Sequence, residues 1–396
     1  MFAEAMIGDE ESHGADESAV DVAAMEPGED GLIGDPSGGG VGLRGFYDLL
    51  YREKVFLVVM LIAIIVTGAV FDQPKIAMWV GFLFAGYSAV ANDSIQTIGT
   101  FISSNRGRPW WQLWAYTGAI FVAVMVWSFL AYDGDVSFGR LQSKGFETAP
   151  SSFEFLHIAA PLVLMVLTRL RMPVSTTFLL LSSFATEGKG IWAVTMKSLS
   201  GYGIAFGVAM VVWLSLGPLM KRRFVGQAHP AWRVAQWLSS GSLWAVWLAQ
   251  DAANIAVYLP RQLSLQQFAV FVMVILAGLA LLFRQGGERI QAVVNEKSHV
   301  IDPRPAAVID FVYASVLLVF QVWSNVPMST TWVFVGLLGG RELALALRRA
   351  TEGGRTVGTA VKMMGRDLAY VTVGFLVALL VAALSNPVVA DALLQK

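Results

Sequence analysis

Long apolar stretches separated by polar loops recur from residue 55 to residue 384, and they limit the fold more than any other feature of the sequence. Charged residues make up only 14% of the chain, against about 25% in an average soluble domain. An α-helix needs roughly 20 predominantly apolar residues to cross a bilayer. We therefore predict an all-α integral membrane protein with about ten transmembrane helices, located in the cell (inner) membrane as a multi-pass protein.

The longest stretches predict single crossings, at residues 55–71, 76–101, 110–132, 191–220, 244–259, 268–283 and 368–384. Other apolar pieces are shorter, at residues 155–167, 173–185, 311–324 and 327–339. A short helix, a proline-containing break and another short helix predict a re-entrant helical hairpin, so these pieces predict two hairpins. The charged segment 341–355 is expected to form an amphipathic helix or a loop outside the core.

Residues 1–44 differ in composition from the rest of the chain. The first 40 residues contain many Asp and Glu side chains but no Lys or Arg, and they end in a glycine-rich run. Such an acidic tail is expected to be disordered, and it lacks the pattern of a cleavable signal peptide. The chain has no cysteine and only four histidines, which are not paired at a metal-ligand spacing. Thiol chemistry and Cys-type zinc sites are thus excluded, and no cofactor is expected.

Three sequence landmarks occur twice in the same order, which predicts an internal duplication. An Asp preceded by an amide side chain occurs at residues 92–93 and 250–251. A Pro-(Val/Met)-Ser-Thr-Thr motif and an Ala-Thr-Glu-Gly motif are also doubled, at residues 173–177 and 327–331, and at residues 185–188 and 350–353. The predicted repeats are residues 45–223 and 224–396, and we expect them to be inverted relative to each other. Duplicated membrane halves are typical of transporters with a site at the repeat interface.

Asp93 and Asp251 carry the strongest chemical signal. A carboxylate inside a membrane helix is costly unless it is paired, neutralised or bound to an ion. On a helix, Asp93 and the polar residues three, four and seven positions later would share one face, and such an oxygen-lined face suits a small monovalent cation. The expected cation-binding residues, with Na⁺ as the ion, are Asn92, Asp93, Gln96, Thr97, Thr100, Gln250, Asp251 and Asn254. The alternative is that these residues hydrogen-bond helices to one another.

The doubled Ser-Thr-Thr sequences are the second signal. A proline in the first turn of a helix would leave each Ser-Thr-Thr at a helix N-terminus, where free N–H groups and the positive end of the dipole favour anions. Two such N-termini meeting near the membrane midplane would hold one oxyanion. The expected substrate-binding residues are Ser175, Thr176, Thr177, Ser329, Thr330 and Thr331. The alternative is that they cap ordinary helices.

Arg171 lies just before the first Ser-Thr-Thr sequence. If residues 155–167 cross the membrane fully, Arg171 is an interfacial anchor. If they form half of a hairpin, Arg171 lies at depth and is a possible partner of the anion or of Asp93. Three other charged residues near predicted helix ends are expected to be solvated or paired: Asp310, Lys197 and Asp367.

Residues 91–100 (Ala-Asn-Asp-Ser-Ile-Gln-Thr-Ile-Gly-Thr) resemble the Ala-Asn-Asp-Val-Ala-Asn-x-x-Gly-Thr signature of the inorganic phosphate transporter (PiT) family. Residues 173–177 and 327–331 resemble its Pro-Val-Ser-Thr-Thr-His signature. The resemblance implies an inverted-repeat transporter with two helical hairpins, usually a dimer, that couples an oxyanion to Na⁺ or H⁺. Phe178 and Trp332 stand where the family has His, and these changes make sulfate or another anion an alternative to phosphate.

We therefore predict a cation-coupled symporter of an inorganic oxyanion, most of all phosphate, with Na⁺ or H⁺ as the coupling ion. A channel or a non-transporting membrane receptor is an alternative. A membrane-embedded enzyme acting on lipid phosphates would need a nucleophile–base pair or a metal cluster, and neither is evident, so we expect no enzyme. The expected partners are the anion, the cation, the lipid bilayer and a second copy of the chain. The Trp-rich stretches predict interfacial belts and no nucleic-acid binding.

Overall fold

The computed structural model describes residues 51, 53–142, 146–170, 172, 174–284, 302–323, 328–349 and 356–394. The chain divides into two units, Met1–Leu57 and Val58–Lys396. The acidic tail predicted at residues 1–44 lies outside the described residues, and the fold below is that of the second unit. Within the described ranges every regular element is helical, so the all-α prediction is confirmed.

The first half of the chain contains α2 to α7 and several short helical turns. Their bounds are α2 (Lys54–Val70), α3 (Pro74–Ala89), η1 (Val90–Ser94), α4 (Ile95–Ser104), α5 (Trp110–Ala131), η2 (Arg140–Gln142), α6 (Phe155–Arg169), η3 (Thr177–Leu181), η4 (Ser182–Phe184) and α7 (Gly188–Arg223). The second half contains α8 (Ala231–Ala256), α9 (Leu265–Arg284), α11 (Pro303–Trp323), α12 (Thr330–Arg349), α13 (Val357–Ser385) and α14 (Pro387–Leu394). One π-helical turn, η1, joins α3 to α4.

Membrane-spanning length is reached by α5, α7, α9, α11, α12 and α13, and by α3 together with the start of η1. Their outward side chains are apolar; Val211, Leu318 and Leu380 are all exposed. A surface of this kind is stable in lipid but not in water, because exposed apolar area costs free energy in water. The protein is therefore a multi-pass membrane protein.

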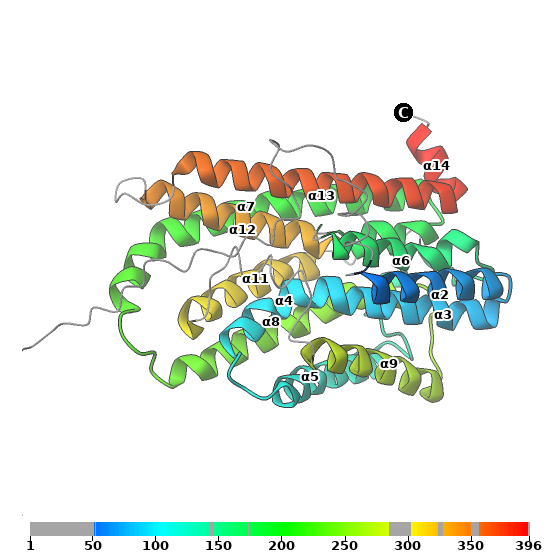
Figure 1. Ribbon diagram of the computed structural model, residues 1–396, viewed down its shortest axis with the longest axis horizontal. Coiled ribbons are helices and arrows are strands. Elements are labelled where there is room, and N and C mark those ends of the chain that lie inside the picture. The colour runs from blue at the N-terminus through cyan, green and yellow to red at the C-terminus, as the bar shows by residue number, and fades with distance from the viewer. Residues whose placement is uncertain are drawn as a thin grey trace, which may run out of the picture. The chain divides into compact units, whose positions relative to one another are not determined.

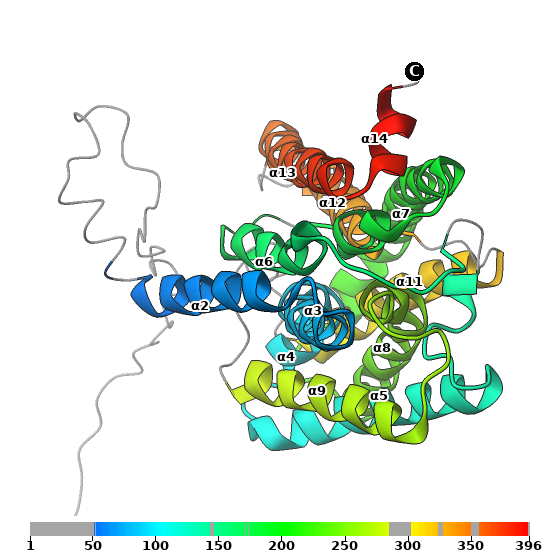
Figure 2. The same ribbon diagram turned by 90° about the vertical axis from the view of Figure 1, so that its right-hand side faces the viewer.

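The helices of the second unit form layers, as Figure 2 shows. On one side α7, α12 and α13 lie together, and on the opposite side α5 packs against α9. Between these groups lie α3, α8 and α11, with α11 packed along α8. In Figure 1, α11 and α12 both reach the middle of the unit, where α12 begins.

Helices α11 and α12 are longer than the apolar stretches that predict them. α11 has 21 residues and α12 has 20, whereas short pieces were expected at 311–324 and 327–339. Charged residues limit the predicted segments, but α11 includes Arg304 and Asp310, and α12 includes Arg341 and Glu342. Arg304 pairs with Asp302 at 2.6 Å, and Arg341 pairs with Glu342 at 2.8 Å. The segment 341–355, predicted to lie outside the core, is thus a continuation of α12 as far as residue 349.

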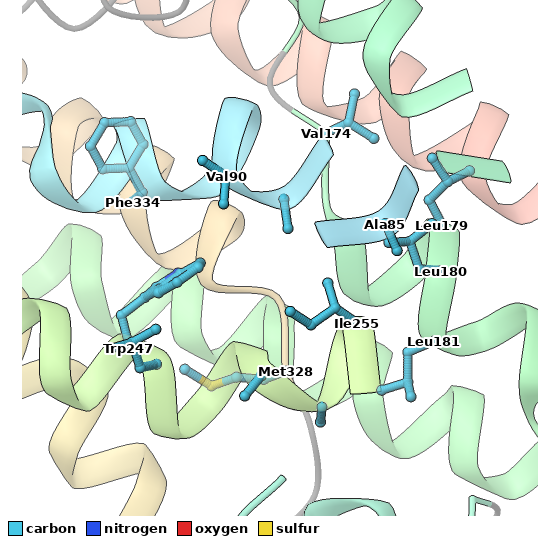
Figure 3. Close-up of a cluster of buried hydrophobic side chains, with 14 of the residues drawn as sticks. Ala85, Val90, Val174, Leu179, Leu180, Leu181, Trp247, Ile255, Met328 and Phe334 are labelled. Carbon is cyan, nitrogen blue, oxygen red and sulfur yellow. The ribbon is translucent and has the colours of Figure 1, made fainter. Parts of the chain in front are cut away.

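Apolar side chains surround the place where the two Ser-Thr-Thr sequences lie. We call residues 174–178 the first tip and residues 328–332 the second tip. Figure 3 shows Val174 of the first tip and Met328 of the second among buried side chains that include Trp247 and Ile255. The polar groups of the tips are therefore held in a region from which surrounding side chains exclude water.

The α7–α12 contact depends on two glycines of α12. A Cβ on Gly336 would overlap the carbonyl oxygen of Tyr202, and a Cβ on Gly340 would overlap that of Phe206. Small residues spaced by four let two helix backbones approach closely in a membrane. This close approach holds α12, and with it the second tip, against α7.

We expect Gly336→Ala and Gly340→Ala each to lower the free energy of unfolding by about 1–3 kcal/mol, because backbone atoms cannot move aside as a flexible side chain can. The measurement is denaturant unfolding of the purified protein in detergent micelles. Gly203→Ala and Gly207→Ala on α7 are matched controls, since no atom lies within 4 Å of a Cβ at either position. Equal stability of the α12 and α7 variants would contradict this account of the helix contact.

Candidate functional site

Each tip ends in a helix start capped by its own serine. Ser175 Oγ accepts a hydrogen bond from the Phe178 N–H at 3.3 Å, and Ser329 Oγ accepts one from the Trp332 N–H at 3.4 Å. These are the N-cap bonds that satisfy a free backbone donor at a helix start. The capping interpretation of the two serines therefore holds in this structure, and each cap fixes the orientation of the two threonines that follow it.

Asp93 lies in the π-helical turn η1 and is 1% exposed. Thr176 Oγ1 donates a hydrogen bond to Asp93 Oδ2 at 2.5 Å. Asn92 Nδ2 donates to Asp93 Oδ1 at 2.6 Å and to the carbonyl oxygen of Val174 at 2.7 Å. The first tip thus bonds Asp93 directly, through Thr176, and indirectly, through Asn92.

Asp251 lies in α8, near its C-terminal end, and is bonded to the second tip in the same way. Thr330 Oγ1 donates to Asp251 Oδ2 at 2.5 Å, and Asn254 Nδ2 donates to Asp251 Oδ1 at 2.7 Å. Trp247 Nε1 donates to Thr330 Oγ1 at 3.3 Å. The Thr330 hydroxyl therefore donates to Asp251 and accepts from the Trp247 indole.

Hydrogen bonds also join the two tips to each other. Thr177 Oγ1 donates to the Met328 carbonyl at 3.1 Å, and Thr331 Oγ1 donates to the Val174 carbonyl at 3.3 Å. Asn254 Nδ2 also donates to Thr176 Oγ1 at 2.9 Å, so it connects the second acid to the first tip. We call the resulting group the tip cluster: Asn92, Asp93, Thr176, Asp251, Asn254 and Thr330.

Several amide oxygens of this region have no hydrogen-bond partner. They are Asn92 Oδ1, Asn254 Oδ1 and Gln250 Oε1, all buried. A buried acceptor without a partner costs free energy, and amide and carboxylate oxygens are the ligands that hard cations use. The donor set next to Asp93 and Asp251 therefore fits a small cation such as Na⁺.

Other hydrogen bonds of the residues expected at a cation site are made outside the tip cluster or within it to the backbone. Gln250 Nε2 donates to the Leu317 carbonyl at 2.8 Å, and Thr97 Oγ1 donates to its own helix at the Asp93 carbonyl at 3.4 Å. Gln96 is buried, with its Nε2 unpartnered. Thr100 donates to Asp310 Oδ1 at 2.5 Å. Arg171 lies outside the described residues.

Asp310 was expected near a helix end, but it is buried inside α11 at 1% exposure. Its second oxygen accepts a hydrogen bond from Ser240, whose hydroxyl also accepts one from Gln236 Nε2 at 3.0 Å. Hydroxyl donors on both oxygens make burial of this acid tolerable. Hydropathy does not reveal its burial, because the apolar stretch 311–324 begins directly after the aspartate.

Two basic residues are buried where the sequence does not predict it. Arg140, in the loop between α5 and α6, is 2% exposed and donates from Nε to the Ala249 carbonyl at 2.7 Å. Lys197, expected near a helix end, lies in the interior of α7 and is buried. The Ser198 hydroxyl, next along the chain, accepts a hydrogen bond from the Ser329 N–H of the second tip at 2.8 Å.

The rings at positions 178 and 332 meet on one residue of α13. Phe375 packs edge-on against Phe178, with ring centroids 4.7 Å apart, and edge-on against Trp332, with centroids 5.8 Å apart. Such edge-to-face pairs contribute about 0.5–1.5 kcal/mol each beyond burial of their area. The aromatic side chains that replace the histidines of the resembled family thus support both tips from the same side.

Comparison with solved structures adds to this geometry. The structure of this chain is similar to that of a protein titled "The sodium-dependent phosphate transporter", with a TM-score of 0.51 and 17% sequence identity. The match covers 80% of this chain and 98% of that one. This chain has the fold of that transporter. No protein-family model matches the sequence, and no curated protein matches it either.

The bond between Asn254 and Thr176 gives a direct test of the tip cluster. We expect Asn254→Ala and Thr176→Val to be non-additive in their effect on the free energy of unfolding, with a coupling of about 1 kcal/mol, because each substitution removes the same bond. The measurement is denaturant unfolding in micelles.

The control cycle pairs Asn254→Ala with Thr195→Val, whose hydroxyl bonds only its own helix at the Ile191 carbonyl. Those two effects should add within about 0.5 kcal/mol. Additivity in the Asn254–Thr176 cycle as well would contradict the connection between the second acid and the first tip.

Proposed function

We propose that this protein is a secondary active transporter that moves an inorganic oxyanion, most of all phosphate, together with Na⁺ or H⁺. The observation that carries the proposal is the tip cluster, in which two buried carboxylates and two helix starts are joined by hydrogen bonds. Such a combination offers ligands for cations and for an anion within one buried region. The fold shared with a sodium-dependent phosphate transporter supports the same conclusion.

The cations would bind at Asp93 and Asp251, one at each carboxylate. The unpartnered amide oxygens of Asn92, Asn254 and Gln250 would complete their shells. Both threonine hydroxyls that now donate to the acids can also act as ligands, because a hydroxyl oxygen has two acceptor lone pairs. Rotation of the hydroxyl hydrogen is the only change in the threonine that cation binding requires.

The anion would bind between the tips, at the backbone N–H groups and hydroxyls of the six Ser and Thr residues. Helix N-termini present such N–H groups together with the positive end of the dipole. Na⁺ at the acids lowers the cost of bringing negative charge into a medium of low dielectric constant. Binding of the cation and the anion would therefore be cooperative, which is the basis of symport.

The internal duplication supports a transport cycle. The first tip bonds the acid of the first predicted repeat, and the second tip bonds the acid of the second. In transporters built from inverted repeats, one repeat moves against the other around a site between them. We propose the same for residues 45–223 and 224–396, in the inner membrane and as a homodimer.

Sulfate or another tetrahedral anion is the alternative substrate, because Phe178 and Trp332 provide apolar rings at the tips. A channel or a non-transporting receptor would use the same helices without coupling. A lipid-phosphate enzyme is less favoured: among the described residues no three His, Cys, Asp or Glu side chains are grouped to hold a metal.

Uptake of labelled phosphate into proteoliposomes with an inward Na⁺ gradient tests the proposal, with labelled sulfate in parallel. We expect Asp93→Asn and Asp251→Asn to abolish the Na⁺ dependence of uptake, because each removes the charge that balances the cation. Asp391→Asn, at an exposed site on α14, is the matched control. Unchanged Na⁺ dependence in Asp93→Asn would reject the cation site.

Calorimetry of the double variant Thr176→Val and Thr330→Val tests the anion site. We expect its affinity for phosphate in saturating Na⁺ to fall by about tenfold or more, since a hydrogen bond to a charged group contributes about 1.5–3 kcal/mol. Thr372→Val, whose hydroxyl bonds only the Leu368 carbonyl of its own helix, is the control. Intact phosphate binding in the double variant would reject the tips as the anion site.

A further inference from the structure

Asp310 is a buried carboxylate for which the proposed function has no use. Its two oxygens accept hydrogen bonds from Thr100 Oγ1, at 2.5 Å, and from Ser240 Oγ. These donors belong to α4 and α8, and both α4 and α11 pack against α8 (Figure 1). Thr100 lies in the first predicted repeat, whereas Ser240 and Asp310 lie in the second. This acid therefore joins the two predicted repeats at a place outside the tip cluster.

The negative charge of Asp310 has no positive partner among the described residues. All the bonds that Asp310 makes there go to the two hydroxyls, and α4 contains no titratable side chain. The other titratable groups with described side chains, on α11 itself and on the helices packed against it, are Arg304 and Tyr313 on α11, Arg233 and Asp251 on α8, Lys189, Lys197, Tyr202, Lys221, Arg222 and Arg223 on α7, and Arg341, Glu342 and Arg348 on α12. An intramembrane acid without a counter-charge is typical of a site that binds a cation or a proton.

A row of polar side chains leads from Asp310 to the loop after α4. Ser240 Oγ accepts a hydrogen bond from Gln236 Nε2 at 3.0 Å, and Gln236 Oε1 accepts one from Asn105 Nδ2 at 3.1 Å. Asn105 Oδ1 accepts in turn from Trp237 Nε1 at 3.0 Å. Residues 106–108, directly after Asn105, are exposed. Polar groups thus connect the buried acid with the surface at this end of α4.

The available oxygens favour a proton over a metal ion at Asp310. A hard cation such as Na⁺ needs several free oxygen ligands. Amide oxygens beside Asp93 and Asp251 lack hydrogen-bond partners, whereas the amide oxygens of Gln236 and Asn105 both accept hydrogen bonds. A proton needs only one carboxylate oxygen, because a hydroxyl that donates to that oxygen can turn and accept instead.

The ionised and the protonated acid tolerate movement differently. An ionised carboxylate in the membrane interior is stabilised by both of its hydroxyl donors, and loss of either one leaves a buried charge less compensated. In the proposed transport cycle, movement of the repeats against each other would shift Thr100 relative to Asp310. The neutral acid withstands this shift better, because it has no charge to desolvate.

We propose that Asp310 is a proton-binding site that controls the movement of the two repeats. This inference rests on the proposed function. The ionised acid holds α4 against α11 through Thr100. A proton that arrives from solvent by way of the polar row binds one carboxylate oxygen and cancels the negative charge, and the hydroxyl that donated to this oxygen becomes an acceptor. The repeats then shift, and release of the proton restores the ionised contact.

Exchange of labelled phosphate across proteoliposomes, with the same pH and the same Na⁺ concentration on both sides, tests the proposal. We expect wild-type exchange to slow by about tenfold per pH unit above the pH at which Asp310 ionises, because the protonated fraction falls by that factor. Asp310→Asn has the shape of the neutral acid, with one donor group and one acceptor. The ratio of Asp310→Asn exchange to wild-type exchange should therefore rise with pH, and this ratio cancels the titration of phosphate in solution. Asp391→Asn, exposed on α14, should follow the wild type.

Thr100→Val provides a second test that retains the carboxyl group. It removes one of the two donors to the ionised acid, so Asp310 should keep its proton to higher pH. We expect the pH at which exchange slows to rise by about one unit or more. Thr372→Val, whose hydroxyl bonds its own helix on the exposed side of α13, should leave this pH unchanged.

Infrared spectroscopy detects the proton on the acid directly. The difference between acidic and alkaline samples of the purified full chain in detergent should contain the C=O band of a protonated carboxyl group, and Asp310→Asn should lack this band. Thermal unfolding of each variant verifies that it is folded. If Asp310→Asn does not fold, the shift expected in Thr100→Val decides.

The outcomes separate this proposal from the proposed function. If the wild type exchanges neither phosphate nor sulfate, the proposed function fails. If the wild type exchanges phosphate but folded Asp310→Asn keeps the wild-type pH profile, retains the infrared band or stops exchange at every pH, the proton site is rejected. Loss of Na⁺ dependence in Asp310→Asn with an unchanged pH profile would instead assign Na⁺ to Asp310 and also reject it. An unshifted profile in Thr100→Val rejects it as well.

Discussion

The hydrogen-bonded connection between two buried carboxylates is the constraint on which the rest of this structure depends. Asp93 bonds Thr176, Thr176 accepts a bond from Asn254, and Asn254 bonds Asp251. Isolated acids at this depth would be unstable in the membrane. The helix starts that deliver Thr176 and Thr330 therefore have to meet in the middle of the unit, and the packing of α7, α8, α11 and α12 serves to bring them there.

Much of this arrangement could be predicted from the sequence. Hydropathy predicts the membrane helices, because a segment exposed to lipid must be apolar along its length. The doubled motifs predict that Asp93 and Asp251 belong with the two Ser-Thr-Thr sequences, and the structure joins each acid to its threonine. The binding roles of these residues remain predictions that the uptake and calorimetry experiments test.

Other features could not be predicted, for identifiable physical reasons. Arg140 lies in a loop that reads as polar and solvated, and only the tertiary structure brings it to Ala249, 109 residues later in the chain. Asp310 and the Arg341–Glu342 pair interrupt apolar stretches, so hydropathy shortened α11 and α12. In each case the charge is stabilised by a partner that is distant in sequence or that lies beyond the predicted end of the helix, and local hydropathy contains neither kind of information.

The rings of Phe178 and Trp332 have a consequence for the pH dependence of the proposed transport. An imidazole at either tip would gain a proton between about pH 5 and 8 and place a new positive charge at that tip. Benzene and indole rings do not titrate in this range, so the two positions keep the same charge as the medium acidifies. Any response of the proposed transport to acid would then originate elsewhere, in the protonation of the anion in solution and of the acidic groups in the bundle.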